Sequence, residues 1–215
     1  MRERPILFSG PMVRALLDGR KTQTRRVVKP QPPEGMEAGF LHIEGEPIPR
    51  ITHGRVVLPQ AAPFVAGDRR WVREAWRLHE RFSDVARIVY QASRGRSWTE
   101  QHVDYPAALA GKLQPSAGFK PSIHMPRWAS RITLEITDVR VERLQDISEE
   151  DCTAEGIGEP YFGDGDPPFV EPGVWVSRRM QFRNLWNHIN GAGSWDANPW
   201  VWVVSFPAIA KDAPQ

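Results

Sequence analysis

Residues 19–26 read Gly19-Arg20-Lys21-Thr22-Gln23-Thr24-Arg25-Arg26 and fall where a predicted helix ends and a predicted strand begins. The preceding Asp18-Gly19 pair is a helix-ending signal, and the chain from Thr24 to Val28 is typical of an extended segment that stops before Pro30. Four basic side chains within eight positions predict a positively charged loop at this junction. Spacing alone leaves two interpretations, a phosphate-binding site and a solvated basic turn.

The elements on either side of this stretch are short and mixed. Apolar alternation and short apolar runs predict strands over 6–8, 24–28, 69–77, 88–91, 131–144 and 200–206. Ser9 is typical of the cap of a helix from about Pro11, and helical periodicity predicts another over 174–189. Ser148, with Asp151 three residues on, forms a capping box for a third helix that ends at Gly156. A bend is expected at Asp138 within the longest strand.

Three segments rich in Pro and Gly interrupt these elements and predict long loops. They cover about 29–66, which includes a small hairpin near 50–58, and about 92–122 and 158–173. Short strands, two or three helices and long loops predict an α+β fold, built as a small β-barrel with flanking helices and loop insertions. The length favours a single domain over residues 1–215.

Composition excludes several classes of protein. The 215 residues are 40% hydrophobic and include nine Trp, so the chain can bury a core and is not disordered. No apolar run approaches the ~20 residues of a membrane span, and the first residues lack the hydrophobic stretch of a secretory leader. Cys152 is the single cysteine, which rules out an internal disulfide and favours a cytoplasmic location. The six His lack zinc-ligand spacing, so we expect no metal and no cofactor.

The charges of the chain are unevenly distributed. Residues 1–131 contain 22 basic and 12 acidic side chains, whereas residues 132–215 contain 6 and 14, which gives +10 and −8 around a formal net charge of +2. This asymmetry favours an anionic partner for the first part of the chain. Only five of the 28 basic residues are lysines, and a GC-rich genome is the alternative explanation for the excess of Arg.

Lys21 is therefore a lysine in a chain that otherwise uses Arg. Unlike Arg, a lysine can lose its proton when it is desolvated or crowded by other cations, and Arg20, Arg25 and Arg26 are near in sequence. A lysine of lowered pKa can deprotonate the hydroxyl of Thr24 or act as an amine nucleophile.

Two carboxylates stand out by position. Glu155 is expected in the last turn of its helix, where the negative end of the helix dipole favours a protonated carboxyl that can serve as a general acid. Glu74 lies on a predicted strand beside apolar positions, and a buried carboxylate there needs a cation such as Lys21 or Arg26. The alternatives are a water-screened Glu155 and an ordinary structural ion pair for Glu74.

The Trp residues divide into two groups. Most lie within predicted strands or on an apolar helix side and are expected in the core, whereas Trp76, Trp98, Trp128 and Trp195 lie at element ends or in loops. An aromatic face at such a place can stack on a base. Trp76 and Trp128 are the two that we assign to substrate binding.

The chain resembles the ASCH family of PUA-like small barrels, whose signature Gly-x-Lys-x-x-Thr-x-Arg is matched by Gly19, Lys21, Thr24 and Arg26. The likeness continues through Gly67-Asp68 into 71–74, the strand around 134–136 and the helix that ends at Glu155. The segments 121–128 and 193–200 are similar to those of longer phage and prophage members. The resemblance implies a PUA-like barrel that binds a nucleotide, a modified nucleoside or RNA.

Small members of that family remove the acetyl group from N-acetylcytidine with a Lys, a Thr and a Glu. By resemblance, Lys21 is the base, Thr24 the nucleophile and Glu155 the proton donor to the departing amine. Arg26 then stabilises the oxyanion or orients the base, and Arg25, Glu74, Trp76 and Trp128 complete the substrate site. The long insertions either close over a nucleoside or replace the substrate.

Three other functions stay open at this level. The first is a non-catalytic RNA- or DNA-binding module in which Lys21 and the Arg cluster hold phosphates. The second is a ribonuclease, and the third is a phage accessory protein that acts through protein contacts of its Trp-rich end. The sequence does not identify a protein partner.

Overall fold

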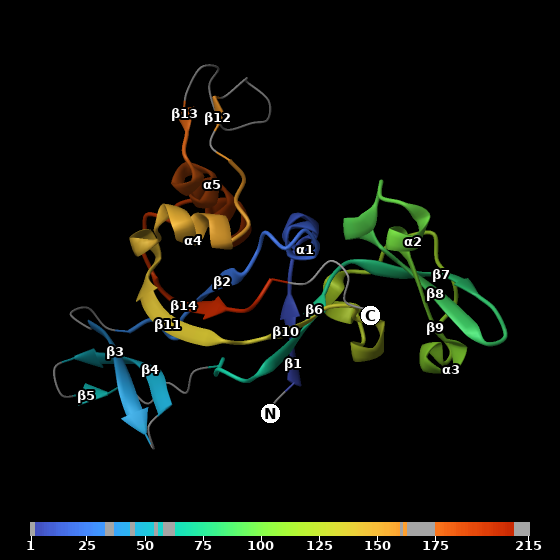
Figure 1. Ribbon diagram of the computed structural model, residues 1–215, viewed down its shortest axis with the longest axis horizontal. Coiled ribbons are helices and arrows are strands. Elements are labelled where there is room, and N and C mark those ends of the chain that lie inside the picture. The colour runs from blue at the N-terminus through green and yellow to red at the C-terminus, as the bar shows by residue number, and fades with distance from the viewer. Residues whose placement is uncertain are drawn as a thin grey trace. The chain divides into compact units, whose positions relative to one another are not determined.

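The computed structural model describes residues 3–32, 37–43, 46–53, 56–57, 63–159, 161–162 and 175–208 (Figure 1). The chain forms two compact units. The described part of the first unit comprises residues 3–19 and 68–135, and that of the second lies within 20–67 and 136–208. The chain leaves the first unit after Gly19 and returns after Gly67, and both glycines have a positive φ, of 71° and 83°, which side chains with a Cβ rarely adopt.

One sheet of the first unit combines its two sequence segments. Strand β1 (Glu3–Leu7) pairs in parallel with β6 (Arg69–Arg73), and β10 (Thr133–Glu135) pairs antiparallel on the other side of β6. Helix α1 (Gly10–Leu17) connects to β1 and buries Val13, Ala15 and Leu16, with Ser9 at its N-cap. The predicted strand and helix before residue 19 are therefore confirmed.

The second sheet of this unit is a meander of β7 (Trp76–Arg81), β8 (Val85–Tyr90) and β9 (His102–Pro106). Its core is a cluster that includes Leu78, Ile88 and Met125. The predicted strand 69–77 is in fact two strands, because the chain breaks at residues 74–75. The expected loop 92–122 likewise contains short elements: 3-10 helices η1 (Gln91–Ser93) and η2 (Ser122–His124), helices α2 (Trp98–Gln101) and α3 (Ala107–Ala110), and strand β9. A further 3-10 turn, η3 (Arg127–Ala129), precedes β10.

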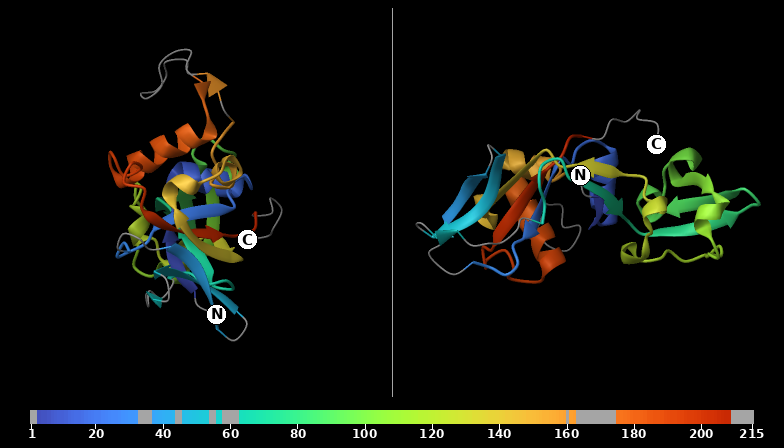
Figure 2. Two further views of the ribbon diagram at one scale, coloured as in Figure 1. Left: turned by 90° about the vertical axis from the view of Figure 1, so that its left-hand side faces the viewer. Right: turned by 90° about the horizontal axis from the view of Figure 1, so that it is seen from below.

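The second unit is built on the antiparallel order β11 (Asp138–Arg143), β14 (Trp200–Ser205) and β2 (Gln23–Val27). The central strand is buried on both faces, which explains its continuous apolar sequence. Val201 and Val203 pack in a cluster with side chains from α4 (Glu149–Ala154) and α5 (Arg178–Asn190), whereas Trp200, Trp202 and Val204 pack in another. The two helices contact each other (Figures 1 and 2). The 3-10 turn η4 (Leu144–Asp146) links β11 to α4.

The helix start and stop signals predicted at Ser148 and Gly156 are confirmed. The hydroxyl of Ser148 accepts a hydrogen bond from the Asp151 backbone N–H at 3.0 Å, and Gly156 ends α4 with a φ of 88°. The long predicted strand 131–144 breaks at residues 136–137, just before the expected bend. The helix predicted over 174–189 begins at Arg178 as α5, because Trp175–Val176 form strand β13. Strand β13 pairs with β12 (Tyr161–Phe162).

The predicted loop 29–66 is the largest error in the expected fold. It contains a three-stranded antiparallel meander of β3 (Glu37–Ile43), β4 (Glu46–His53) and β5 (Val56–Val57), and β3 and β4 lie against β11. Only its β4–β5 part corresponds to the predicted hairpin at 50–58. Most of the predicted loop 158–173 lies outside the described residues.

Helices and small sheets together confirm the α+β class. The described strands form five sheets, each of them open, so the closed barrel stays a prediction. Among the described residues, no helix has the length and apolar character needed to span a bilayer.

Candidate functional site

The centre of the candidate site is an ion pair between the end of one helix and the start of one strand. Lys21 lies two residues before the start of β2, and Glu155 is the C-cap residue of α4. Between them, the Thr22 N–H donates to the Ala154 carbonyl at 2.8 Å. The Lys21 ammonium donates to the Glu155 carboxylate at 2.6 Å and to the Glu155 backbone carbonyl at 2.8 Å. Both side chains are buried, that of Lys21 completely. The two residues are 134 positions apart, and the structure brings them together as the sequence predicts.

The surroundings act on Lys21 in the predicted direction. Burial is the main cause that lowers the pKa of Lys21, and the charges of Arg26 and Arg25 act the same way, while Glu155 opposes them. Desolvation therefore contributes more than the crowding by Arg that the sequence emphasises. Arg20 is exposed and donates to the Gly156 carbonyl at 3.2 Å.

Arg25 connects Glu155 to two further carboxylates. Its guanidinium donates to Glu155 at 3.3 Å, to Asp151 at 2.8 Å and to Glu142 through two nitrogens. It also donates to the Gln23 side-chain oxygen at 2.7 Å. Because this side chain is fully buried among protein partners, Arg25 positions Glu155 in this structure, whereas the sequence assigns it to substrate contact.

Asp151 shows the strength of this network. Burial raises the pKa of Asp151, but the hydrogen bond from Arg140 and the charges of Arg25 and Arg140 outweigh it, so the pKa lies below its usual value. The Arg140 guanidinium contacts both Asp151 oxygens, at 2.9 and 2.8 Å, and Glu142 at 3.0 Å. A charge-paired cluster of this kind holds the end of α4 against β2 and β11.

Thr24 and Arg26 are the second and fourth residues of β2, which pairs with β14. The Thr24 side chain is buried, and its hydroxyl oxygen accepts a hydrogen bond from Arg26 at 3.0 Å. Arg26 is half-buried and also donates to the Arg25 carbonyl at 3.1 Å. A hydroxyl that accepts from a guanidinium keeps its own proton available for donation to a base. Lys21, Thr24, Arg26 and Glu155 all belong to the second unit.

Glu74 belongs to the first unit and has a different partner from those expected. Arg131 donates to its two oxygens at 2.9 and 3.0 Å, and neither Lys21 nor Arg26 is the cation of this pair. Arg131 also donates to the Ser93 hydroxyl at 2.8 Å and lies 4.0 Å from the centre of the Tyr90 ring. Burial raises the pKa of Glu74, and Arg131 opposes that shift. This arrangement corresponds to the structural ion pair that the sequence left open.

The two Trp residues assigned to substrate binding are also in the first unit. Trp76 is 1% exposed and packs edge to face against Trp128, with ring centres 6.1 Å apart. Trp128 is half-buried against the same core cluster. Trp195 is buried in the second unit, so Trp98, at 58% exposed, is the one of the four loop Trp residues with a largely exposed ring. Neither spacing nor neighbours distinguish it in the sequence.

Two of the three carboxylates around Arg25, Asp151 and Glu142, were not predicted as site residues. Asp151 and Glu155 are four residues apart on α4, a spacing that places both on one helix face. Glu142 alternates with buried Val141 on β11, so it lies on the opposite side of that strand. These signals exist, but their convergence on Arg25 requires the tertiary fold. In the described residues there is no group of three or more His, Cys, Asp or Glu side chains suited to a metal ion.

Comparison with known proteins identifies no relative of this chain. No protein-family model, curated protein or solved structure gives a significant match to the chain.

Glu74→Gln is expected to lower the free energy of unfolding by about 2 kcal/mol, because a neutral amide replaces one member of a buried, charge-assisted pair. We expect any turnover at the Lys21 site to be unchanged per folded molecule. Urea unfolding and activity measured on the same preparations check both statements, with Glu135→Gln, an exposed carboxylate of the same unit, as the matched control. A variant of unchanged stability that loses turnover would place Glu74 in the reaction.

Proposed function

We propose that the chain is a cytoplasmic, ASCH-type protein of phage or prophage origin with a PUA-like core, which binds RNA, a nucleotide or a modified nucleoside. We further propose that its Lys21 site hydrolyses the acetamide of an acetylated cytidine or a related nucleoside. The observation that supports this most is the dry, direct contact of 2.6 Å between Lys21 and Glu155. A base and an acid that share a proton in a desolvated place are suited to proton transfer.

The proposed reaction follows from these side chains. The Lys21 ammonium first passes the proton of its hydrogen bond to Glu155, which leaves a neutral amine and a carboxylic acid. The amine then takes the proton of the Thr24 hydroxyl, whose oxygen attacks the acetamide carbonyl and forms a C–O bond. Arg26, which donates to the Thr24 hydroxyl in the structure, stabilises the oxyanion that forms on the acetamide carbonyl oxygen. Glu155 gives its proton to the exocyclic nitrogen as the C–N bond breaks, and cytidine leaves. Glu155, now a carboxylate, takes a proton from water, whose oxygen attacks the acetyl carbon of the acetyl-Thr24 ester. The C–O bond to Thr24 then breaks, acetate leaves, and the Lys21 ammonium returns its proton to the Thr24 oxygen.

Burial of the site favours a second candidate, a non-catalytic nucleic-acid-binding module. The Lys21 ammonium donates twice to Glu155, and the side chains of Lys21, Thr24 and Glu155 are each at most about 5% exposed. In this alternative the pair stabilises the junction of β2 with α4, and phosphates are held by exposed Arg residues elsewhere. The hydrolase proposal requires local opening that admits an acetyl group to Thr24.

Incubation with acetylated cytidine and with total RNA, with products measured by mass, separates the two candidates. We expect cytidine and acetate from the wild type, and none above background from Lys21→Ala or from Thr24→Val, which keeps the shape of Thr24 but removes the hydroxyl. Absence of product from either substrate, together with salt-sensitive RNA binding, would reject the hydrolase in favour of the binding module. RNA cleavage that persists in Lys21→Ala would place a ribonuclease activity at another site.

A further inference from the structure

The outer face of the β7–β8–β9 sheet carries an aromatic cluster that the Lys21 site does not use. Leu78, Ile88 and Tyr90 point from this sheet into the core cluster. Strand alternation therefore turns Arg87, Val89 and the paired His102 and Asp104 to the opposite face. A register shift between Leu78 and Glu80 adds His79 as an extra residue on β7.

Trp98 lies across all three strands on this face. Its ring stacks on His102 of β9, with ring centres 3.4 Å apart and an interplanar angle of 20°. It also meets His79 of β7 edge to face at 6.3 Å, and the Arg87 guanidinium of β8 lies 5.9 Å from its centre. His79 and His102 are themselves 5.1 Å apart. We call Trp98, His102, His79 and Arg87 the Trp98 platform.

The platform is held rigidly although its principal ring is exposed. Ser97 and Glu100 form a capping box at the start of α2, where Trp98 is the first helical residue. The His102 Nδ1 lies 2.9 Å from the Trp98 carbonyl, and Arg87 is fixed by two contacts to Asp104 at 2.8 and 3.0 Å and one to Glu80 at 2.8 Å. An exposed ring that is fixed in place loses little entropy when a flat ligand covers it.

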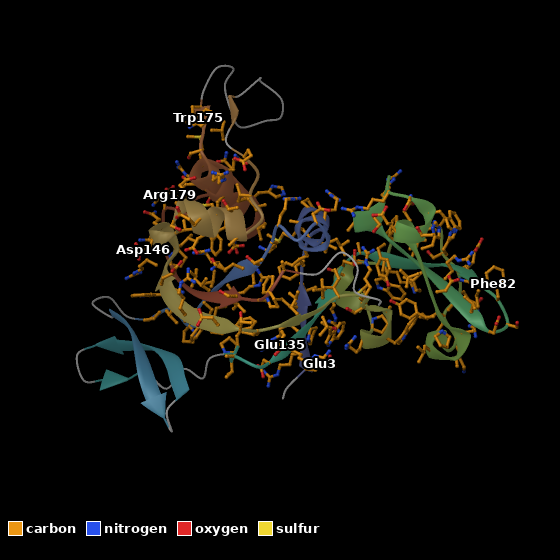
Figure 3. The ribbon with its side chains drawn as sticks, viewed as in Figure 1. Glu3, Phe82, Glu135, Asp146, Trp175 and Arg179 are labelled. Carbon is orange, nitrogen blue, oxygen red and sulfur yellow. The ribbon has the colours of Figure 1, made fainter. Side chains whose placement is uncertain are left out.

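Core packing does not explain Trp98. Its side chain is 58% exposed, and Phe82, at the tip of the β7–β8 hairpin, is 52% exposed and lies with its ring centre 5.6 Å from Arg87 (Figure 3). The exposed rings of Trp98 and Phe82 indicate a surface that a ligand covers.

The charge of the surrounding segment indicates the kind of ligand. Residues 76–120 contain seven Lys and Arg against four Asp and Glu, so the segment is net positive. Burial is the main cause that lowers the pKa of His79, with Arg77 acting the same way, so this ring is neutral at pH 7 and presents a π-face. Because Arg87 is already paired with Asp104 and Glu80, stacking and not phosphate contact is the dominant attraction. A strand with unpaired bases and a negative backbone fits both features.

We propose that the Trp98 platform is a binding surface for single-stranded RNA, on which Trp98 stacks an unpaired base. The choice of RNA over DNA rests on the proposed function, which concerns a ribonucleoside. The surface itself rests on the contacts of the first unit and does not depend on hydrolysis at Lys21.

The test measures binding of a fluorescein-labelled, 12-nucleotide unstructured RNA by anisotropy to the full chain. Trp98→Ala is expected to weaken binding about tenfold, because one base–aromatic stack is lost, while Trp98→Phe retains most of the affinity. Trp175→Ala is the matched control, since Trp175 is 52% exposed and belongs to the second unit. It should bind as the wild type does. We also expect the same RNA annealed to its complement to bind more weakly than the single strand, because its bases are already stacked.

The proposal would be overturned by equal RNA affinity of Trp98→Ala and wild type, by equal affinity for the single strand and the duplex, or by tighter binding of the DNA strand of the same sequence. The outcome is distinguishable from that of the proposed function. Lys21→Ala should lose acetylcytidine hydrolysis and keep RNA binding, whereas Trp98→Ala should bind RNA about tenfold more weakly and keep hydrolysis of the free nucleoside. Capture of a protein partner through Trp98 with no affinity for RNA would also count against the proposal.

Discussion

Lys21→Arg is expected to reduce acetylcytidine hydrolysis by at least about a hundredfold, the lower end of what a general base contributes. Arg keeps the positive charge but does not release its proton at any pH that the protein tolerates, so it cannot activate Thr24. A residue that only contacts phosphate would tolerate this change. Burial lowers the pKa of Lys21 in the structure, and that shift is useful to a base and of no benefit to a phosphate ligand.

The larger guanidinium also has a packing cost, which the controls must separate from chemistry. The Lys21 side chain is fully buried, so overpacking of about 1–3 kcal/mol is expected. Lys21→Met keeps much of the length of the side chain without the amine and should be equally inactive. Lys112→Arg, at an exposed lysine, should change neither activity nor stability. Initial rates on acetylcytidine, divided by the folded fraction from urea titration, give the comparison. Turnover by Lys21→Arg at the wild-type rate would remove Lys21 as the base.

The elements that sequence reasoning located are those with strong local signals. The Ser148 cap, the positive-φ glycines at 19 and 156 and the apolar run of β14 each act within a few residues, and the structure has them where the sequence predicts. The sheet of β3, β4 and β5 was missed because β4 contains Pro47 and Pro49, which lack a backbone donor and lower any strand prediction. Its pairing with neighbouring strands overrides that local cost.

The candidate site likewise contains residues that the sequence identifies and contacts that it does not. Lys21, Thr24 and Glu155 were identified from residue type and position, and Lys21 does contact Glu155. The partner of Glu74 could not be inferred, because Arg131 is 57 residues away and the chain offers many other cations. The convergence of Glu142, Asp151 and Glu155 on Arg25 depends on how β11 and α4 pack against β2, which no local pattern encodes.

Arg25→Ala is expected to lower the free energy of unfolding by about 3–5 kcal/mol, more than any exposed substitution in the second unit. The change leaves Glu142, Asp151 and Glu155 without the cation that they share, and it opens a cavity where a fully buried side chain lay. Lys21 and Arg140 compensate only in part, because each contacts one side of the cluster. Urea unfolding followed by Trp fluorescence measures the loss. Arg183→Ala is the control, since its exposed pair with Asp196, at 3.7 Å, contributes at most about 1 kcal/mol.

The pH dependence distinguishes charge from packing as the cause of this loss. The folded-state pKa of Asp151 is lowered, with burial opposed and outweighed by Arg140 and Arg25, so its pairing stabilises the wild type above the unfolded pKa of about 3.9. That stabilisation is lost as the pH falls through the lower, folded pKa. Arg25→Ala has less of it to lose, so the stability gap between the two proteins should narrow as the pH falls below about 4. A gap that stays constant between pH 7 and pH 3 would assign the loss to packing, and Arg25 would then be a space-filling residue and not the cation that orients Glu155.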